Sequence, residues 1–113
     1  MNNLTTTERV RLDRVYRKAK HEAGIARKYG DVHDYFNTVE WIPFEDELEQ
    51  LGFNKAALRF RFLRFRVARL YKRLLTQSQN YSSRIAIAYR VQFEKSIQSW
   101  YRINRYIENI IHE

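Results

Sequence analysis

The sequence predicts an all-α protein, a three-helix-bundle-like fold with one additional short helix. Only three glycines and one proline occur among 113 residues, so long stretches lack the residues that interrupt helices. In three of these stretches apolar residues recur at intervals of three and four, which is the period of one helix face. We therefore expect long helices over residues 5–29, 54–77 and 82–112, and a short acidic helix over residues 44–51.

The first predicted helix begins with a capping signal. Thr5 and Glu8 have the spacing of a capping box, and Gly30 follows the expected last residue, Tyr29. Its apolar residues form one narrow, alanine-rich stripe that suits close packing against another helix. The stripe consists of Leu12, Val15, Tyr16, Ala19, Ala23 and Ala26.

Residues 31–43 lack a helical period and end in the only proline, Pro43. We expect a connecting loop here that places four large apolar side chains on the body of the protein. These are Tyr35, Phe36, Trp41 and Ile42. The short helix over residues 44–51 should follow and end at Gly52, since glycine readily takes the left-handed conformation of a helix C-terminus.

The principal helix, residues 54–77, has the sharpest period, and Asn54 is its expected cap. Steps of three and four residues give it the spacing of a helix–helix seam. The seam residues are Phe60, Leu63, Val67, Leu70 and Leu74. Residues 59–62 and 65–67 also alternate like a half-buried strand, but the length of the seam and the lack of a strand partner elsewhere favour a helix.

The last helix, residues 82–112, carries seven large apolar or aromatic residues and one asparagine on one face. These are Ile85, Tyr89, Phe93, Ile97, Trp100, Asn104, Ile107 and Ile111. Because only a short polar segment, residues 78–83, separates it from the principal helix, the two helices should pack antiparallel.

Charge is distributed unevenly along the chain. The net charge is +8, yet residues 31–50 contain seven of the thirteen acidic residues and no Lys or Arg. By contrast, eight Lys or Arg and no carboxylate lie between Lys55 and Arg73, interleaved with Phe60, Phe62, Phe65 and Tyr71. Such an accumulation of positive charge favours an acidic partner. The acidic segment either pairs with this helix or docks a second basic protein, and the sequence does not decide between them.

Several functional classes have little support. The chain has no cysteine, and its three histidines lack the paired spacing of metal ligands, so we expect no metal site, no cofactor of its own and no catalytic residues. No run approaches the about 20 apolar residues that cross a bilayer. Residues 4–29 resemble a mitochondrial presequence in being Arg-rich and amphipathic, but Glu8, Asp13 and Glu22 favour a structural helix. We expect a soluble, intracellular, non-enzymatic protein with one domain.

One motif resembles a known family. Residues 69–75 read Arg-Leu-Tyr-Lys-Arg-Leu-Leu, and residues 88–94, after a polar turn, read Ala-Tyr-Arg-Val-Gln-Phe-Glu. Together they resemble the LYR-motif family of small mitochondrial helical proteins, with Leu70-Tyr71-Lys72 as the tripeptide and Phe93 as the aromatic residue of the next helix. Lys72 replaces the family's arginine and lacks its planar, bidentate fork. Residues 1–53 form an extension before the motif helix, and residues 5–29 would close the bundle.

The resemblance implies binding of the mitochondrial acyl carrier protein, an acidic protein that would supply its own acyl-phosphopantetheine. The residues it assigns to the acidic partner are Arg59, Arg66, Arg69, Lys72 and Arg73. Those assigned to packing of the motif are Leu70, Tyr71 and Leu74. Those assigned to a slot for the acyl chain are Phe60, Leu63, Val67, Phe93 and Ile97. Residues 31–50 and 100–111 are candidates for contact with a larger complex.

The motif is most similar to that of the LYR accessory subunit in the distal membrane arm of respiratory complex I, which implies a place on the matrix side of the inner mitochondrial membrane. An iron–sulfur assembly adaptor is the second interpretation, because Ser78-x-x-Tyr81-Ser82 resembles its inter-helix turn. RNA binding by a ribosome-associated protein is the alternative from another class, because basic and aromatic residues suit phosphate contacts and base stacking. Two features oppose RNA binding: the aromatic residues fall on the buried seam, and the acidic segment would repel phosphates.

Overall fold

The computed structural model describes residues 4–76 and 84–112, and it is all-α, as the sequence predicts. The elements are α1 (Thr6–Tyr29), α2 (Val32–Asn37), the 3-10 helix η1 (Val39–Trp41), α3 (Ile42–Gln50), α4 (Asn54–Thr76) and α5 (Arg84–His112). The predicted helix ends at residues 77 and 82, and the turn at 78–83, lie outside the described residues.

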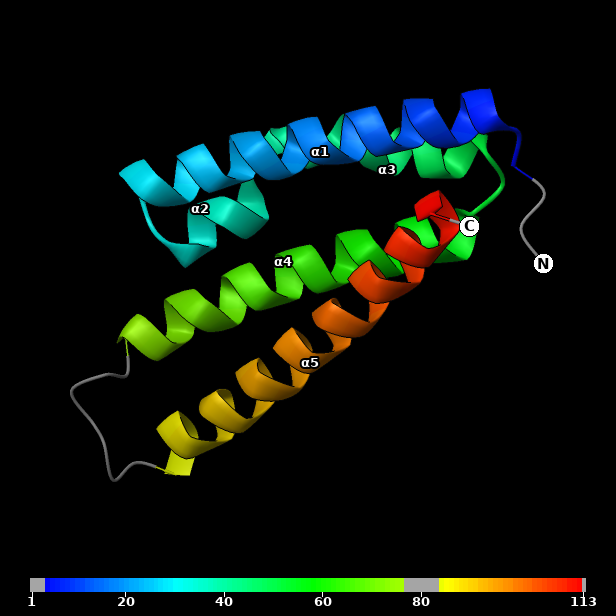
Figure 1. Ribbon diagram of the computed structural model, residues 1–113. Coiled ribbons are helices and arrows are strands. Elements are labelled where there is room, and N and C mark those ends of the chain that lie inside the picture. Colours follow the sequence, from blue (N-terminus) through cyan, green and yellow to red (C-terminus); the bar gives the residue numbers. More distant parts are fainter. Residues whose placement is uncertain (1–3, 77–83, 113) are drawn as a thin grey trace.

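The helices form layers (Figure 1). The helices α4 and α5 pack against each other in antiparallel directions, which confirms the predicted pair. The short elements α2, η1 and α3 fill the space between α1 and α4, so that in the described part of the chain no Cα atom of α1 comes within 8 Å of one in α4. Closure of the bundle by α1 therefore takes place through these short helices and through the C-terminal part of α5, which α1 also contacts.

The loop predicted for residues 31–43 is wrong, because most of this segment is helical. Asp31 caps α2 in a reciprocal pair with Asp34: the Asp34 amide donates to Oδ1 of Asp31 at 3.2 Å, and the Asp31 amide donates to Oδ2 of Asp34 at 2.8 Å. Pro43 lies in the first turn of α3, where a missing N–H costs nothing, so it opens a helix and does not end a loop. A six-residue helix is too short to show a period in the sequence.

The end of α3 agrees with the prediction. Gly52 has φ +93°, the left-handed conformation that glycine adopts without steric cost. The Phe53 amide then donates to the carbonyl of Leu48 at 2.9 Å, which closes the helix and turns the chain into α4.

The core is an aromatic cluster at the crossing of η1, α3, α4 and α5. Trp41 and Phe60 have no exposed surface, and their ring centroids are 5.2 Å apart. Trp100 of α5 packs on Phe60 at 4.5 Å and on Phe36 of α2 at 4.8 Å. The predicted burial of Phe36 and Trp41 is thus confirmed, whereas Ile42 is 44% exposed.

Tyr16 joins α1 to α5 through its hydroxyl group. The hydroxyl oxygen lies 2.9 Å from Oδ1 of Asn104 and 3.2 Å from Oε1 of Glu108, and the hydroxyl donates to these acceptors. Burial of the phenol, together with the neighbouring carboxylate of Glu108, raises the pKa of Tyr16 well above its ordinary value of 10.0. The folded protein therefore retains this proton at a pH where the unfolded chain loses it.

The raised pKa of Tyr16 predicts a loss of stability in alkali. Above pH 10.0 the unfolded chain binds fewer protons than the folded one, so the free energy of unfolding should fall as pH rises. Urea denaturation at pH values below and above 10.0 should show a shallower decline for Tyr16→Phe than for the wild type. Tyr29→Phe is the control, because Tyr29 is 82% exposed. Equal declines in the wild type and Tyr16→Phe would contradict this account.

Candidate partner-binding surface

The acidic segment pairs with basic residues of the same chain. Glu45, which is fully buried, receives two hydrogen bonds from Arg64: Nε to Oε2 at 2.7 Å and Nη2 to Oε1 at 3.1 Å. Arg61 donates to the same carboxylate at 3.1 Å. Glu47 pairs with Arg11 of α1 at 2.9 Å, and Asp31 lies 4.0 Å from Nζ of Lys72. The sequence left open whether the acidic segment pairs within the chain or docks a second basic protein. Glu45, Glu47 and Asp31 pair within the chain.

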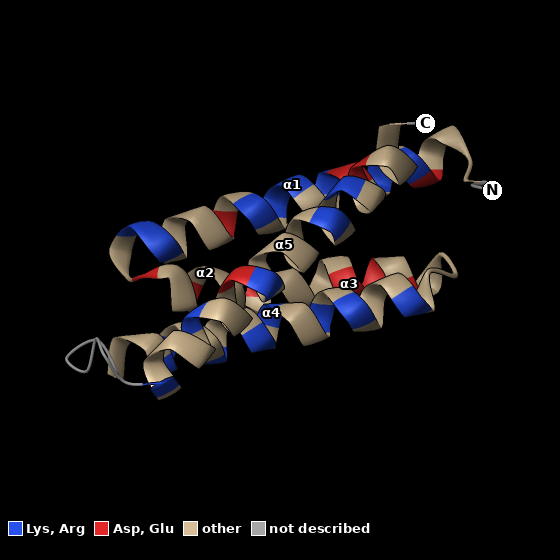
Figure 2. Ribbon diagram, turned by 90° about the horizontal axis from the view of Figure 1, so that it is seen from below, with Lys and Arg blue, Asp and Glu red and all other residues tan. Residues whose placement is uncertain are grey.

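The cations of α4 fall into two groups. Arg61 and Arg64 face α3 and are used internally. Apart from Lys55 in the first turn, the others accompany two exposed phenylalanines along the helix, and we call this set the basic face of α4. It consists of Arg59, Phe62, Phe65, Arg66, Arg69, Lys72 and Arg73. Figure 2 shows blue segments along α4 and red segments on the neighbouring α3.

Most cations of the basic face have no acidic partner. In the described residues no ion pair involves Arg59, Arg66, Arg69 or Arg73. Arg66 donates through Nε to Oγ of Ser96 on α5 at 3.0 Å, and the guanidinium of Arg73 lies 5.4 Å from the ring centroid of Tyr89. These two side chains therefore also hold α4 against α5.

Two aromatic side chains of the basic face are exposed to solvent. Phe62 is 60% exposed and Phe65 is 48% exposed. Phe62 lines a shallow depression between α4 and α5 together with Arg59 and Arg66, and Phe65 lines another, towards α2, together with Arg69. Sequence reasoning counted both phenylalanines with the apolar content of the helix and did not single them out. The sequence does contain one indication of their exposure, which is that neither position belongs to the apolar seam of this helix.

The LYR-like tripeptide lies at the C-terminal end of the seam. Leu70 is buried at 2% exposure, and Tyr71 and Leu74 are half-buried. The ring of Tyr71 lies 6.2 Å from that of Phe93, so the tripeptide and the later aromatic residue of the motif meet between α4 and α5. Lys72 points towards α2, where Asp31 is its acidic neighbour.

The residues assigned to the acyl slot do not form one site. Phe60 and Val67 are fully buried in the closed core, and Leu63 lines the shallow depression beside Arg66. Phe93 and Ile97 line a cavity of about 350 Å³ that none of these three residues touches. The structure thus separates the predicted slot, and only its α5 members line this larger cavity.

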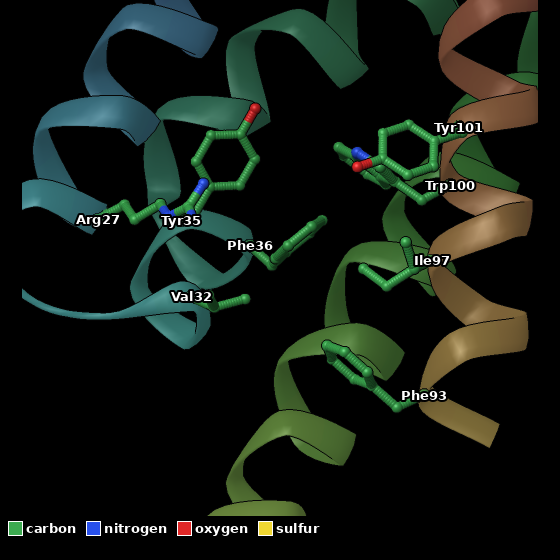
Figure 3. Close-up of a pocket in the computed structure, with 8 residues that line it drawn as sticks. All are labelled: Arg27, Val32, Tyr35, Phe36, Phe93, Ile97, Trp100 and Tyr101. Atoms are coloured by element: carbon green, nitrogen blue, oxygen red, sulfur yellow. The ribbon is translucent and has the colours of Figure 1, made fainter. Parts of the chain in front are cut away.

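This cavity lies between α2 and α5 at the end of α1 (Figure 3). Phe93, Ile97, Trp100 and Tyr101 of α5 form one wall, Val32, Tyr35 and Phe36 of α2 form the other, and Arg27 comes from α1. Sequence reasoning did not assign Arg27, because residues so distant along the chain meet only through the placement of α2.

A group of possible metal ligands, Asp31, His33 and Asp34, occurs at the start of α2. Their ligand atoms lie within 4.8 Å of one another. Both carboxylates already serve as helix caps, and the hydrogen bond from the Asp31 backbone holds the pKa of Asp34 below its ordinary value. Lys72 is also close by. These contacts account for the group as a cap, and the absence of a bound metal stays a prediction.

Within residues 4–76 and 84–112, no helix combines the length and apolar character needed to cross a membrane. Comparisons with protein-family models, curated protein sequences and solved structures found no match to this chain.

Proposed function

We propose that this protein is a non-catalytic adaptor that binds an acidic acyl carrier protein on the basic face of α4. The resemblance of residues 69–75 and 88–94 to the LYR motif supports this proposal, and so does the meeting of Tyr71 with Phe93. On the same resemblance, the host assembly is respiratory complex I and the location is the matrix side of the inner mitochondrial membrane. An iron–sulfur assembly adaptor of the same family is the nearest alternative host.

The observation that carries the proposal is the combination of unpaired arginines with exposed aromatic rings. Arg59 and Arg69 have no ion-pair partner among the described residues, and Phe62, which lies between them along the helix, is 60% exposed. An amphipathic acidic helix supplies carboxylates for the guanidinium groups and apolar side chains for the ring. Exposed phenylalanine rings beside arginines on one helix face are typical of a protein interaction site, and they suit a partner of this kind.

The acyl chain of the carrier would enter the cavity beside Phe93 and Ile97 and not the core around Phe60. Val32 and Phe36 of α2 line that cavity, whereas His33 and Asn37 line the basic depression with Arg69. The two sites therefore lie on adjacent faces of α2, and the carrier's flexible arm would pass around this helix to join them.

The two candidate segments for contact with a larger complex are mostly used within the chain. Trp100, Ile103, Ile107 and Ile111 are buried, and Glu45 and Glu47 have internal partners. The outer side of α5 offers Ile87 and Val91 instead, 52% and 44% exposed and one helical turn apart. We propose that these residues, and not the C-terminal apolar positions, contact the host assembly.

Reversing two charges tests the carrier proposal. Arg59→Glu combined with Arg69→Glu should raise the Kd for an acylated carrier protein by about a hundredfold or more, because facing like charges cost several kcal/mol. Helicity should not change, since neither side chain has a hydrogen bond or an ion pair among residues 4–76 and 84–112. Arg14→Glu with Lys18→Glu is the matched control, as it applies the same change in net charge to exposed positions on α1. Equal loss of binding in both variants would contradict a specific surface.

RNA is the second candidate partner, and the structure weakens two objections to it. Phe62 and Phe65 are exposed and not buried in the seam, and the carboxylates of Glu45 and Glu47 are neutralised by arginines. If RNA binds here, log Kobs should fall with log salt at about −0.7 per phosphate contact, as for single strands. Phe62→Ala with Phe65→Ala should then weaken binding through lost stacking. A salt-independent or absent interaction would exclude this candidate.

A further inference from the structure

The cavity between α2 and α5 combines an apolar lining with a single charged residue. Of its eight described lining residues, seven are aromatic or aliphatic and one, Arg27, is a cation. Its volume of about 350 Å³ is near the lower end of small-molecule sites, which span roughly 300–1,000 Å³. A ligand that fits would therefore be small, mostly hydrocarbon, and negatively charged at one end.

The guanidinium group of Arg27 is available to such a ligand. Arg27 is exposed, and no hydrogen bond or ion pair in the described part of the chain engages it. It lies beside the ring of Tyr35 at the α1 end of the cavity, and Phe93 belongs to the opposite wall, which α5 forms (Figure 3). Burial raises the pKa of the Tyr35 hydroxyl, and the positive charge of Arg27 offsets part of this rise.

We propose that the cavity binds a free medium-chain monocarboxylate, with the carboxylate on Arg27 and the chain along Phe93 and Ile97. The planar guanidinium matches a carboxylate with two parallel hydrogen bonds. Each methylene that leaves water adds roughly fourfold to affinity. The half-buried rings on both walls provide the apolar surface that such a chain covers.

This ligand differs from the carrier-borne chain, and the inference does not rest on the carrier proposal. An acyl group held by a carrier is a thioester, which has no charge where the chain begins, so it forms no ion pair with Arg27. A free carboxylate does. Binding of the free acid depends on Arg27, whereas binding of the carrier depends on Arg59 and Arg69 of the basic face, so the two proposals fail separately.

Calorimetric titration of the full-length protein with decanoate and with decanol, both below their aggregation concentrations, tests the inference. The wild type should bind decanoate at least about tenfold more tightly than decanol, since a hydrogen bond to a charged group contributes this much. Arg27→Gln should lose that preference. Lys28→Gln, which removes the neighbouring cation outside the cavity, should retain it. Equal binding of the two ligands by the wild type would overturn the proposal.

A second variant tests the location of the chain. Ile97→Trp places a larger side chain into the cavity and should weaken decanoate and decanol alike by about tenfold or more, with helicity checked by circular dichroism. Decanoate binding that is unchanged in Ile97→Trp or in Arg27→Gln would overturn the proposed site. So would the lack of saturable binding in the wild type.

Discussion

Replacing Arg64 by alanine should destabilise the protein by about 3–5 kcal/mol, the usual effect of breaking a buried ion pair by removing one partner. The side chain of Arg64 is 2% exposed and that of Glu45 is 0% exposed. The substitution also removes the donor that bonds the carbonyl of Phe36 at 3.0 Å. A buried carboxylate and a buried carbonyl would both lose hydrogen bonds, and urea denaturation followed by circular dichroism measures the result.

Two further variants separate the burial effect from the loss of charge. Arg61→Ala removes a cation from the same carboxylate, but its side chain is 35% exposed, so we expect a loss of only about 1 kcal/mol. Glu45→Leu combined with Arg64→Met replaces both charges by apolar groups and should recover part of the stability lost in Arg64→Ala. Equal losses in Arg61→Ala and Arg64→Ala would contradict the assignment of Arg64 as the buried partner.

Replacing Trp41 by alanine should destabilise the protein by a similar amount, about 3–5 kcal/mol. Trp41 is fully buried, and its ring packs against those of Phe44, Phe60 and Trp100. Its indole Nε1 also donates to the carbonyl of Tyr35 at 2.9 Å. Because Trp41 connects the short helices to both long ones, its removal should loosen α2 and α3 together, which thermal unfolding and hydrogen exchange would detect.

The conservative variant Trp41→Phe retains an aromatic ring but loses the indole hydrogen bond. We expect it to be clearly more stable than Trp41→Ala, since most of the effect comes from packing. A loss below about 1 kcal/mol in Trp41→Ala, measured by urea denaturation, would show that the cluster is not the centre of the core.

The long helices could be predicted from the sequence because their apolar residues have a clear period. The seam from Phe60 to Leu74 is long enough to establish a helix, and Gly52 marks the turn before it. In α2 the period is not measurable over six residues. Its only local signal is the pair Asp31 and Asp34, which has capping-box spacing with aspartate in place of glutamate.

The buried ion pair illustrates a second limit. Arg64 is one of seven cations between residues 59 and 73, and charge alone does not distinguish it from the others. One local signal exists: Ala57 and Ala68, seven residues before and four after Arg64, lie on the same side of α4 and are also buried. Small residues there allow α2 and α3 to approach. Glu45 has no such signal, because three further acids follow it within four residues and nothing in the sequence sets it apart from them.

The candidate site is predictable to different extents. Arg59 and Arg69 were assigned from the family resemblance together with the positive charge of this helix, and the structure leaves both without ion-pair partners in the described residues. Phe62 and Phe65 lie outside the seam, which is a local signal for exposure, but how much of each ring stays exposed depends on how α5 and α2 pack beside α4. The cavity likewise depends on the tertiary placement of α2, and this is why Arg27 was missed.

The most direct test of the proposed function is recovery of the tagged full-length protein from its own cells at moderate salt, with intact mass measurement of the co-purifying proteins. The proposal predicts a small acidic carrier protein bearing acylated phosphopantetheine, which Arg59→Glu with Arg69→Glu eliminates and the α1 control variant retains. Recovery of RNA without such a carrier, or recovery of the carrier irrespective of the charge reversal, would contradict it.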